Sequence, residues 1–241
     1  MPERLLYEGK AKKVFATDDE YVLLHRYKDD ATAFDGRKRG RISGKGRTNA
    51  TMSAAVFAYL EARGVPTHFI GQIDEGSIKT KRLEMLPVEV VVRNVAAGSL
   101  AKRIGYEEGA PLKAPIVELY LKDDTLGDPL LNRYHFRELG VADEDLDFCE
   151  ELGLKVNQIL VPFFDQKGVV LVDFKIEVGR DANGQLMLAD EISPDTCRFW
   201  DKETGEKLDK DRFRRDMGNV EEAYEEMLRR VTEAQPRMTM D

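Results

Sequence analysis

The stretch "GVVLVDFKIEVG", residues 168–179, alternates charged and apolar side chains along its second half. Side chains two residues apart on a β-strand point to the same face of a sheet. One face of the predicted strand is apolar and is made by Val172, Phe174, Ile176 and Val178. The other face gathers Asp173, Lys175 and Glu177. This alternation is typical of an antiparallel sheet with one face in the core. It leaves open whether the polar face meets solvent or lines a site.

A second strand follows at once and brings further acids to the same region. The turn "DANG", residues 181–184, joins the first strand to "QLMLADEI", residues 185–192, in a predicted hairpin. Antiparallel pairing then brings Asp190 and Glu191 back toward the first strand. Several carboxylates in one place repel each other unless cations lie between them. Lys175 supplies one cation, and Mg²⁺, which prefers oxygen ligands, is the natural second.

The first part of the chain is rich in predicted strands. Five are expected, over residues 12–17, 21–27, 67–73, 77–83 and 88–94. A helix interrupts them, because apolar residues recur at helical spacing over residues 52–60 and Gly64 with Pro66 supplies a stop. This half therefore reads as an antiparallel sheet region with one helix.

The second part contains more helix. An apolar stripe runs over residues 146–160, and Pro162 is expected to kink or end that helix. The last helix is expected from Asn219, with Glu222 as its capping-box partner. The whole pattern predicts an α+β fold in which an antiparallel sheet region precedes a sheet-and-helix region, with a cleft between them.

Composition excludes several classes of protein. The chain has 241 residues, 42% of them hydrophobic, which suffices for one large domain or two small ones. Its formal charge of −8 argues against a nucleic-acid partner or an anionic membrane surface. Apolar runs are too short for a membrane span, and no secretory signal is expected. Two cysteines and three scattered histidines indicate neither a disulfide framework nor a zinc site, so a cytoplasmic protein is expected.

Two stretches could each bind a phosphate. In "LYEGKAKKVF", residues 6–15, Gly9 stands beside Lys10 and Lys12 between two predicted strands. A glycine lets backbone N–H groups approach a phosphate and lysines neutralise it, although a solvated basic hairpin is an equal alternative. Farther on, Arg93 lies near the end of a predicted strand and Ser99 lies at the start of a predicted helix. That pair suits an anion as well, unless it is a helix cap with a surface arginine.

Two loops complete the set of candidates. Ser193, Asp195 and Arg198 follow the second strand of the hairpin and could grip a polar, anionic small molecule. Residues 35–47 are rich in glycine and charge without periodicity, and a helix is expected only from Thr48. We interpret that stretch as a mobile loop, which is either a lid over a site or a plain connector.

Three motifs in a fixed order give the chain a specific resemblance. They are "LPVEVVVRNVAAGS" at residues 86–99, "LVDFKIEVG" at 171–179 and "DEISPDTCRFWD" at 190–201. Together with "LYEGKAKKVF" they resemble the SAICAR synthetases (phosphoribosylaminoimidazole-succinocarboxamide synthases) over almost the whole chain. Enzymes of that family join the carboxylate of carboxyaminoimidazole ribotide (CAIR) to the amine of L-aspartate, with ATP converted to ADP and phosphate.

The resemblance implies roles for individual residues. ATP would be covered by Lys10, Ala11, Lys12 and Val14, and adenine would meet a hinge that contains Leu83 and Met85. Mg²⁺ would be held by Glu177 and Asp190. CAIR would be surrounded by Arg93, Ser99, Asp173, Lys175, Asp195 and Arg198. Asp35 and Lys45 match the family's loop over the site, although this loop has more arginine and glycine than the family pattern. The residues expected to act in catalysis are Lys12, Asp173 and Lys175.

The resemblance also implies an architecture. It predicts two α+β domains, residues 1–88 and 89–241, with the site between them and a distant similarity to ATP-grasp and kinase-like folds. A homodimer is expected. Two rival hypotheses are a small-molecule kinase, which would pass phosphate to a hydroxyl, and a nucleotide-binding regulatory protein without catalysis. Formation of an amide that requires ATP, CAIR and aspartate together would separate the ligase from both.

Overall fold

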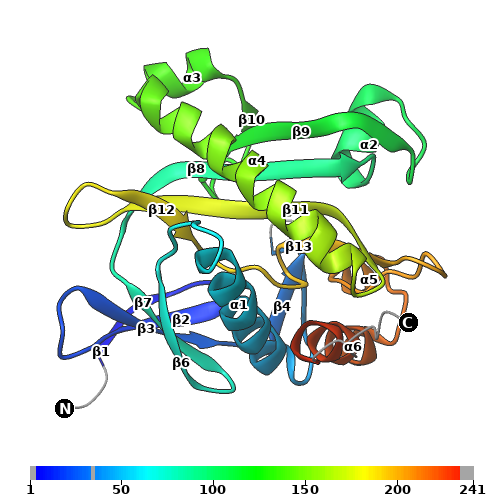
Figure 1. The fold of residues 1–241 in the computed structure, drawn as a ribbon, viewed down its shortest axis with the longest axis horizontal. Coiled ribbons are helices and arrows are strands. Elements are labelled where there is room, and N and C mark those ends of the chain that lie inside the picture. Colours follow the sequence, from blue (N-terminus) through cyan, green and yellow to red (C-terminus); the bar gives the residue numbers. More distant parts are fainter. Residues whose placement is uncertain (1–3, 34–35, 234–241) are drawn as a thin grey trace, which may run out of the picture.

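Two larger antiparallel sheets and six helices make up the described part of the chain, residues 4–33 and 36–233, in a computed structural model (Figure 1). The first sheet has five strands, whose order across the sheet is β1 (Arg4–Glu8), β2 (Lys12–Ala16), β3 (Val22–Tyr27), β7 (Ser77–Lys81) and β6 (Phe69–Asp74). The predicted hairpin of residues 12–27 is confirmed, because β2 and β3 pair with Lys12 opposite Tyr27. A polar turn between two β-branched and aromatic runs is sufficient to specify it.

The second sheet carries the charged strand from which the prediction began. Its path is β10 (Leu130–Leu131), β9 (Pro111–Leu121), β8 (Glu84–Val95), β11 (Val169–Arg180) and β12 (Leu186–Ala189), and β13 (Cys197–Asp201) also pairs with β11. The predicted β11–β12 hairpin is confirmed, with Glu177 opposite Ala189. The predicted α+β class is confirmed as well.

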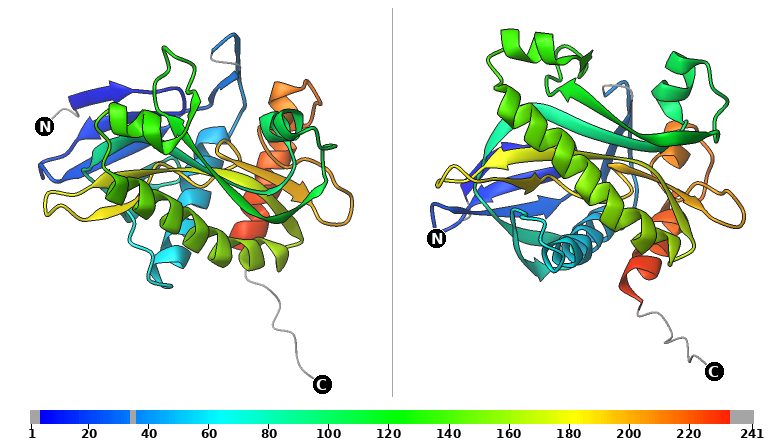
Figure 2. Two further views of the ribbon diagram at one scale, coloured as in Figure 1. Left: turned by 90° about the horizontal axis from the view of Figure 1, so that it is seen from above. Right: turned by 45° about the horizontal axis from the view of Figure 1, so that its top comes forward.

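One long helix covers the apolar face of this sheet (Figure 2). α4 (Asp143–Asp165) packs on β8 and β11, and a Cβ at its Gly153 would stand 3.0 Å from Val92 and 3.1 Å from Val90. Phe174, Ile176 and Val178 of β11 are fully buried in the same core. Val172 is also fully buried but lies outside that cluster, where the pairing of β11 with β13 shifts register. Because α4 takes one face of the sheet, the face with Asp173, Lys175 and Glu177 is turned toward the first sheet.

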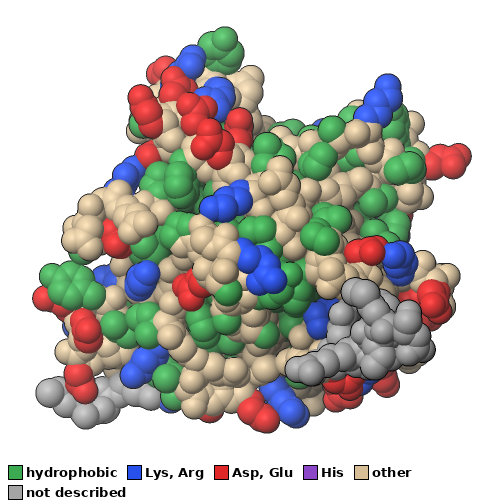
Figure 3. Space-filling model, viewed as in Figure 1, with side chains coloured by type: hydrophobic (Ala, Val, Ile, Leu, Met, Phe, Trp, Pro, Cys, Tyr) green, Lys and Arg blue, Asp and Glu red, His purple; other side chains and the backbone are tan. Residues whose placement is uncertain are grey.

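Acidic side chains gather at the corner formed by α3 (Arg133–Glu138) and the start of α4 (Figure 3). The first turn of α4 contains Asp143, Glu144 and Asp145, where the helix dipole favours negative charge. Part of the net negative charge is therefore accounted for by a helix end at the surface.

The remaining helices are α1 (Lys45–Glu61), α2 (Gly98–Ile104), α5 (Asp211–Arg214) and α6 (Val220–Thr232). α1 confirms the predicted helix before Gly64, and α6 packs against it. Pro162 does not end α4, because Phe163 and Phe164 after it are buried and the helix continues to Asp165. The last helix begins at Val220, beside the expected Asn219, but the expected capping box is wrong. Asn219 has a left-handed backbone (φ 49°) and makes no side-chain cap, for which an extended backbone is required.

The prediction that residues 35–47 form a loop without regular structure is wrong for its described part. β4 (Asp30–Ala33) pairs with β5 (Lys38–Arg41), and α1 begins at Lys45. The hairpin is held on α5 and the residues just after it, since a Cβ at Gly40 would stand 2.9 Å from the Phe213 ring of α5 and Lys38 lies 2.6 Å from Asp216. Asp35 itself lies outside the described residues.

The expected domain boundary after residue 88 falls inside β8, which begins at Glu84 and pairs with β11 from Met85 onward. A division before β8 keeps the second sheet whole. α1, which precedes that division in the chain, nevertheless packs into the core of the second sheet. A boundary drawn in the sequence therefore does not divide the packed core in two.

Candidate active site

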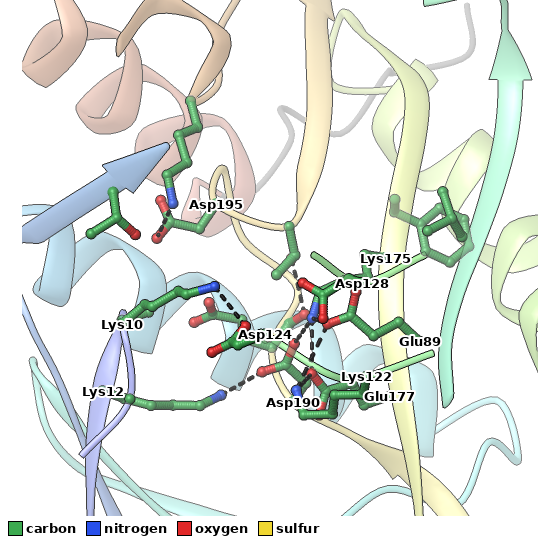
Figure 4. A pocket seen from close by; sticks show the side chains of 18 of the residues that line it. Lys10, Lys12, Glu89, Lys122, Asp124, Asp128, Lys175, Glu177, Asp190 and Asp195 are labelled. Carbon is green, nitrogen blue, oxygen red and sulfur yellow. Dashed lines mark hydrogen bonds and ion pairs between the residues drawn. The ribbon is translucent and has the colours of Figure 1, made fainter. Parts of the chain in front are cut away.

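A cleft lies between the first sheet and the polar face of the second (Figure 4). Backbone and side chains of residues 9–12 form one wall, and β8 and β11 form the other. The turn between β4 and β5 and the short helix α5 close one end, through Gly36 and Arg214 among others. Parts of the chain more than 100 residues apart thus line one cavity.

The polar wall is built by three neighbouring strands. In the pairing of β8 with β11, Glu89 stands opposite Glu177 and Arg93 opposite Asp173. In the pairing of β8 with β9, Glu89 stands opposite Tyr120. Residues opposite each other in register share a face, so the charged alternation of β11 continues across the sheet.

Three lysines and three carboxylates meet in the cleft, where this wall faces Lys12 of β2, and form the lysine–carboxylate cluster: Lys12, Lys122, Lys175, Glu89, Glu177 and Asp190. Lys175 Nζ stands at the centre, 3.0 Å from Glu89 Oε1 and 2.9 Å from Glu177 Oε1. It also lies 2.9 Å from Asp190 Oδ2, while Lys12 of β2 reaches across the cleft to Asp190 Oδ1 at 2.6 Å (Figure 4).

Asp190 joins the two sides of the cleft. It follows β12 with a left-handed backbone (φ 69°), which is uncommon for a residue other than glycine. Such strain persists where the surroundings over-determine it, and here Lys12 and Lys175 hold the carboxylate from two sides. The carboxylate is thereby aimed into the cleft.

Burial and pairing oppose each other in this cluster. Burial would raise the pKa of Asp190, but Lys12, Lys175 and Lys122 hold it well below its usual value. Burial would lower the pKa of Lys175, yet the facing carboxylates raise it well above normal. The charged forms of Asp190 and Lys175 are therefore stabilised by their neighbours, whereas burial, which outweighs Lys175, raises the pKa of Glu89.

A second network surrounds Arg93. Its Nε donates to Glu118 Oε2 at 2.6 Å and one terminal nitrogen donates to Asp173 Oδ2 at 2.8 Å. Arg198 approaches Asp173 from the other side at 2.9 Å and also binds Asp211 at 2.9 Å. Two guanidinium groups therefore flank one carboxylate at the cleft wall.

A third network fixes Asp195. Lys45, the first residue of α1, has a fully buried side chain whose Nζ lies 2.8 Å from Asp195 Oδ2. Tyr224 of α6 donates its hydroxyl to Asp195 Oδ1 at 2.6 Å. Burial would raise the pKa of Asp195, but Lys210 and Lys45 hold it below its usual value.

Comparison with known proteins decides the family. Residues 5–231 match the family model described as SAICAR synthetase. A phosphoribosylaminoimidazole-succinocarboxamide synthase of Desulfitobacterium hafniense strain Y51 is 59% identical over 231 residues, which are 95% of this chain and 97% of the relative.

The chain belongs to the SAICAR synthetase family. A relative from Deinococcus radiodurans with the same enzyme name is 55% identical and covers 94% of this chain and 96% of its own length. A solved structure described as SAICAR synthetase (Type-2) in complex with ADP superposes with a TM-score of 0.92 at 53% identity, covering 95% of this chain and 98% of its own. The Pyrococcus horikoshii SAICAR synthetase gives a TM-score of 0.89 at 50% identity, covering 94% and 99%.

The predicted membership is confirmed, and the protein is an enzyme of that family, a ligase of purine biosynthesis. Most of the predicted site residues line the cleft: Lys10, Ala11, Lys12, Val14, Arg93, Asp173, Lys175, Glu177, Asp190, Asp195 and Arg198. Ser99 lies behind Arg93, with its Oγ 3.5 Å from the guanidinium. Lys45 is buried behind Asp195.

The predicted adenine hinge stands apart from that lining. The side chains of Leu83 and Met85 pack over Gly179, at 2.8 and 2.9 Å from the position of a Cβ there. Their role toward adenine stays a prediction.

Several residues of the cleft were missed by the sequence reasoning. Glu89 and Lys122 belong to the lysine–carboxylate cluster, and Lys210 and Arg214 line the end near α5. A signal existed for Glu89, which lies on the same face of β8 as Arg93, as the charges on β11 share one face. The segment that holds the other two has no such periodicity.

Proposed function

We propose that the cleft joins the carboxylate of CAIR to the amine of L-aspartate through an acyl phosphate, with ATP converted to ADP and phosphate. The observation that carries the proposal is the lysine–carboxylate cluster facing the Arg93–Asp173–Arg198 network in one cleft. The lysine–carboxylate cluster suits a nucleoside triphosphate with its metal ion. The Arg93–Asp173–Arg198 network suits a phosphorylated, polar substrate.

The chemistry of amide formation explains why the protein needs only to position the substrates and to stabilise charge. A carboxylate is a poor acylating agent, so its oxygen first attacks the γ-phosphorus of ATP and the bond from that phosphorus to ADP breaks. The aspartate amine then attacks the acyl carbon, an amide C–N bond forms and phosphate leaves. Negative charge moves in both steps, and fixed cations that face it lower the barriers.

In the half of the cleft assigned to the nucleotide, Lys12 lies where it can bind phosphate oxygens. It projects from β2 into the cleft, and burial, which alone would lower its pKa, is outweighed by Asp190, so that the amine stays charged. Lys10 beside it reaches Asp124 at 2.7 Å on the rim. We assign the binding of ATP to residues 10–14. A structural relative has been solved in complex with ADP, which accords with a nucleotide site in this fold.

A Mg²⁺ ion fits the carboxylates of Glu177 and Asp190. Both lie 2.9 Å from Lys175 Nζ, so both reach one cation position. Within residues 4–33 and 36–233, no group of three or more histidine, cysteine and acidic side chains is arranged for a metal. Two carboxylates with phosphate oxygens and water is the coordination that Mg²⁺ usually adopts. When bound, the ion supplies positive charge against the phosphates.

In the other half, Arg93 and Arg198 are assigned to CAIR, with Ser99 behind them. Asp173 holds the two arginines in fixed positions, and Gly98 leaves room for Arg198, whose terminal nitrogen lies 2.6 Å from the place of a Cβ. The carboxylate of CAIR then faces Lys175 between the two halves. We assign Lys12, Lys175 and Asp173 to catalysis on this basis.

We further propose a cytoplasmic homodimer with two domains divided before β8. In the described parts of the chain, no helix has the length and apolar character to cross a membrane. The pathway to which the family belongs and the two free, buried cysteines accord with a reducing compartment. Size-exclusion chromatography with light scattering tests the dimer.

The function is tested by following ADP release and product mass with ATP, CAIR and L-aspartate, each omitted in turn. We expect ADP and the amide to form in equal amounts and only when all three are present. A phosphorylated substrate released without aspartate would instead identify a kinase. Tight nucleotide binding without ADP release would identify a regulatory protein.

A further inference from the structure

The regular pairing of β8 with β11 ends at the two residues that begin the arginine network. Arg93 of β8 stands opposite Asp173 of β11 as the last pair of their ladder in the described chain. On its other side, β8 loses register with β9 between Arg93 and Val95. Asn94 therefore lies where both ladders of β8 break, directly after the residue that points into the cleft.

A side chain supplies a hydrogen bond where the ladder stops. Asn94 Nδ2 donates to the backbone carbonyl of Leu171, two residues before Asp173, at 3.0 Å. Leu171 stands opposite Phe199 of β13, but the backbone N–H of Phe199 donates to Asp209 Oδ2 at 2.9 Å. The Asn94 amide thus provides a donor to a backbone carbonyl beside the register shift of β11, which lies between Leu171 and Asp173.

A second amide holds Asn94 in this orientation. Asn94 Nδ2 donates to Asn157 Oδ1 at 2.8 Å, and Asn157 Nδ2 donates back to Asn94 Oδ1 at 2.9 Å. Asn157 is a buried residue of α4, which packs on both β8 and β11. A side-chain amide carries two N–H donors, so Asn94 can bind Asn157 and the Leu171 carbonyl at the same time.

Asn94 acts from behind the cleft wall. Neighbouring side chains of a strand point to opposite faces, so Asn94 faces α4 while Arg93 faces the cleft. Neither Asn94 nor Asn157 is among the described residues that line the cleft. A change at Asn94 can therefore reach the cleft only through the ends of β8 and β11, where Arg93 lies 2.8 Å from Asp173.

We infer that Asn94 is a positioning residue for the CAIR side of the cleft, because its amide ties the ends of β8 and β11 and so fixes Arg93 against Asp173. This inference rests on the proposed function, which assigns Arg93 to CAIR. The nucleotide side does not depend on this tie, since the ladder between β8 and β11 is unbroken from Asp173 to Glu177. A displacement of about 1 Å in a substrate-positioning group can cost about 10²-fold in rate, so a small shift of the strand ends is sufficient.

Two substitutions of the same kind separate positioning from stability. Asn94→Leu removes the amide pair and also the hydrogen bond to the Leu171 carbonyl. Asn157→Leu is the matched control, because it removes the same amide pair but leaves Asn94 Nδ2 able to donate to Leu171. Steady-state kinetics for ATP, CAIR and L-aspartate and the melting temperature are measured for both. Asn94→Ala serves as a second variant if Asn94→Leu does not fold.

We expect Asn94→Leu to raise the KM for CAIR about 5- to 10-fold, within the range for the loss of one hydrogen bond, and to leave the KM for ATP within about twofold. Asn157→Leu should lower the melting temperature as well, but its KM for CAIR should stay within about twofold of the wild type. A merely structural role would not produce this difference between the two variants.

The inference is overturned by equal rises in the KM for CAIR in the Asn94 and Asn157 variants, or by equal rises for CAIR and ATP in Asn94→Leu. Failure of both Asn94 variants to fold identifies a structural residue and overturns it too. A wild type that forms no amide from ATP, CAIR and L-aspartate overturns the proposed function itself, before any variant is compared.

Discussion

The buried pair of Lys45 and Asp195 gives the most direct test of how the site is held. Substitution Lys45→Met preserves the length of the side chain and removes its charge. The lysine has no exposed surface and the carboxylate is 4% exposed, so the pair is isolated from water. Removing one member of such a pair destabilises a protein by about 3–5 kcal/mol, because the other charge is left buried without a partner.

The surroundings favour the lower end of that range. Tyr224 still donates to Asp195, and Lys210 at 3.5 Å offers a second cation. We therefore expect the free energy of unfolding to fall by about 3 kcal/mol, and the melting temperature by about 6–12 °C for a chain of this size. Urea unfolding, followed by fluorescence of the one tryptophan, Trp200, measures the change.

A double-mutant cycle identifies the cause. Asp195→Asn should destabilise the Lys45→Met protein clearly less than it destabilises the wild type, because the unpaired carboxylate is then gone. Arg47→Met on the same helix is the control, since its ion pair with Glu75 is exposed and contributes about 0–1 kcal/mol. A loss below about 1 kcal/mol for Lys45→Met, or additivity within about 0.5 kcal/mol, would refute the reasoning.

Three further predictions concern the cleft and its surroundings. Glu177→Gln should lower kcat by about 10²–10³ with the fold retained and shift the Mg²⁺ dependence to higher concentration, as judged by metal titration and circular dichroism; near-normal turnover at saturating Mg²⁺ contradicts the metal assignment. Arg93→Lys should raise the KM for CAIR far more than that for ATP, because an ammonium cannot bind Glu118 and Asp173 in the same fork; equal rises in kinetic assays would count against it. Burial lowers the pKa of His68 to about 3, so the unfolded state binds the extra proton and stability is lost as pH falls below about 6.5. The stability difference between the wild type and His68→Gln should therefore change by about 2 kcal/mol from pH 7 to pH 5 in urea titrations, and a pH-independent difference would disprove the shift.

The alternation in β11 was enough to predict both faces of the central strand from Asp173 onward. Phe174, Ile176 and Val178 are fully buried in the core that contains α4, and Asp173, Lys175 and Glu177 line the cleft; Val172 stands at a register shift and lies outside that core cluster, which takes Leu171 instead. A period of two is a local property of the sequence, so no knowledge of distant contacts was needed. The same reasoning applied to β8 would have added Glu89 beside Arg93.

The burial of Lys45 could not be predicted in this way. Its stretch contains glycine and charge without periodicity, which locally resembles a connector. Its order comes from Asp195, 150 residues later, and from Phe213, on which β5 packs. Lys210 and Arg214 were missed for the same reason, because a single helical turn in a charged segment carries no pattern of its own. Tertiary contacts of high sequence separation decide such positions.

The distribution of charge in the cleft suits it to anionic substrates. The lysine–carboxylate cluster has three positive and three negative members, so it is formally neutral and suits a nucleotide that arrives with its own metal ion. At the opposite end Lys45, Lys210, Arg198, Arg214 and Arg93 are paired with Asp173, Asp195, Asp211 and Glu118, and Glu191 also lines the cleft. The acyl phosphate would form where these two regions meet, at Lys175, with cations on both sides before any substrate is bound. That arrangement requires little reorganisation during the reaction, which is the condition under which fixed charges stabilise a transition state most strongly.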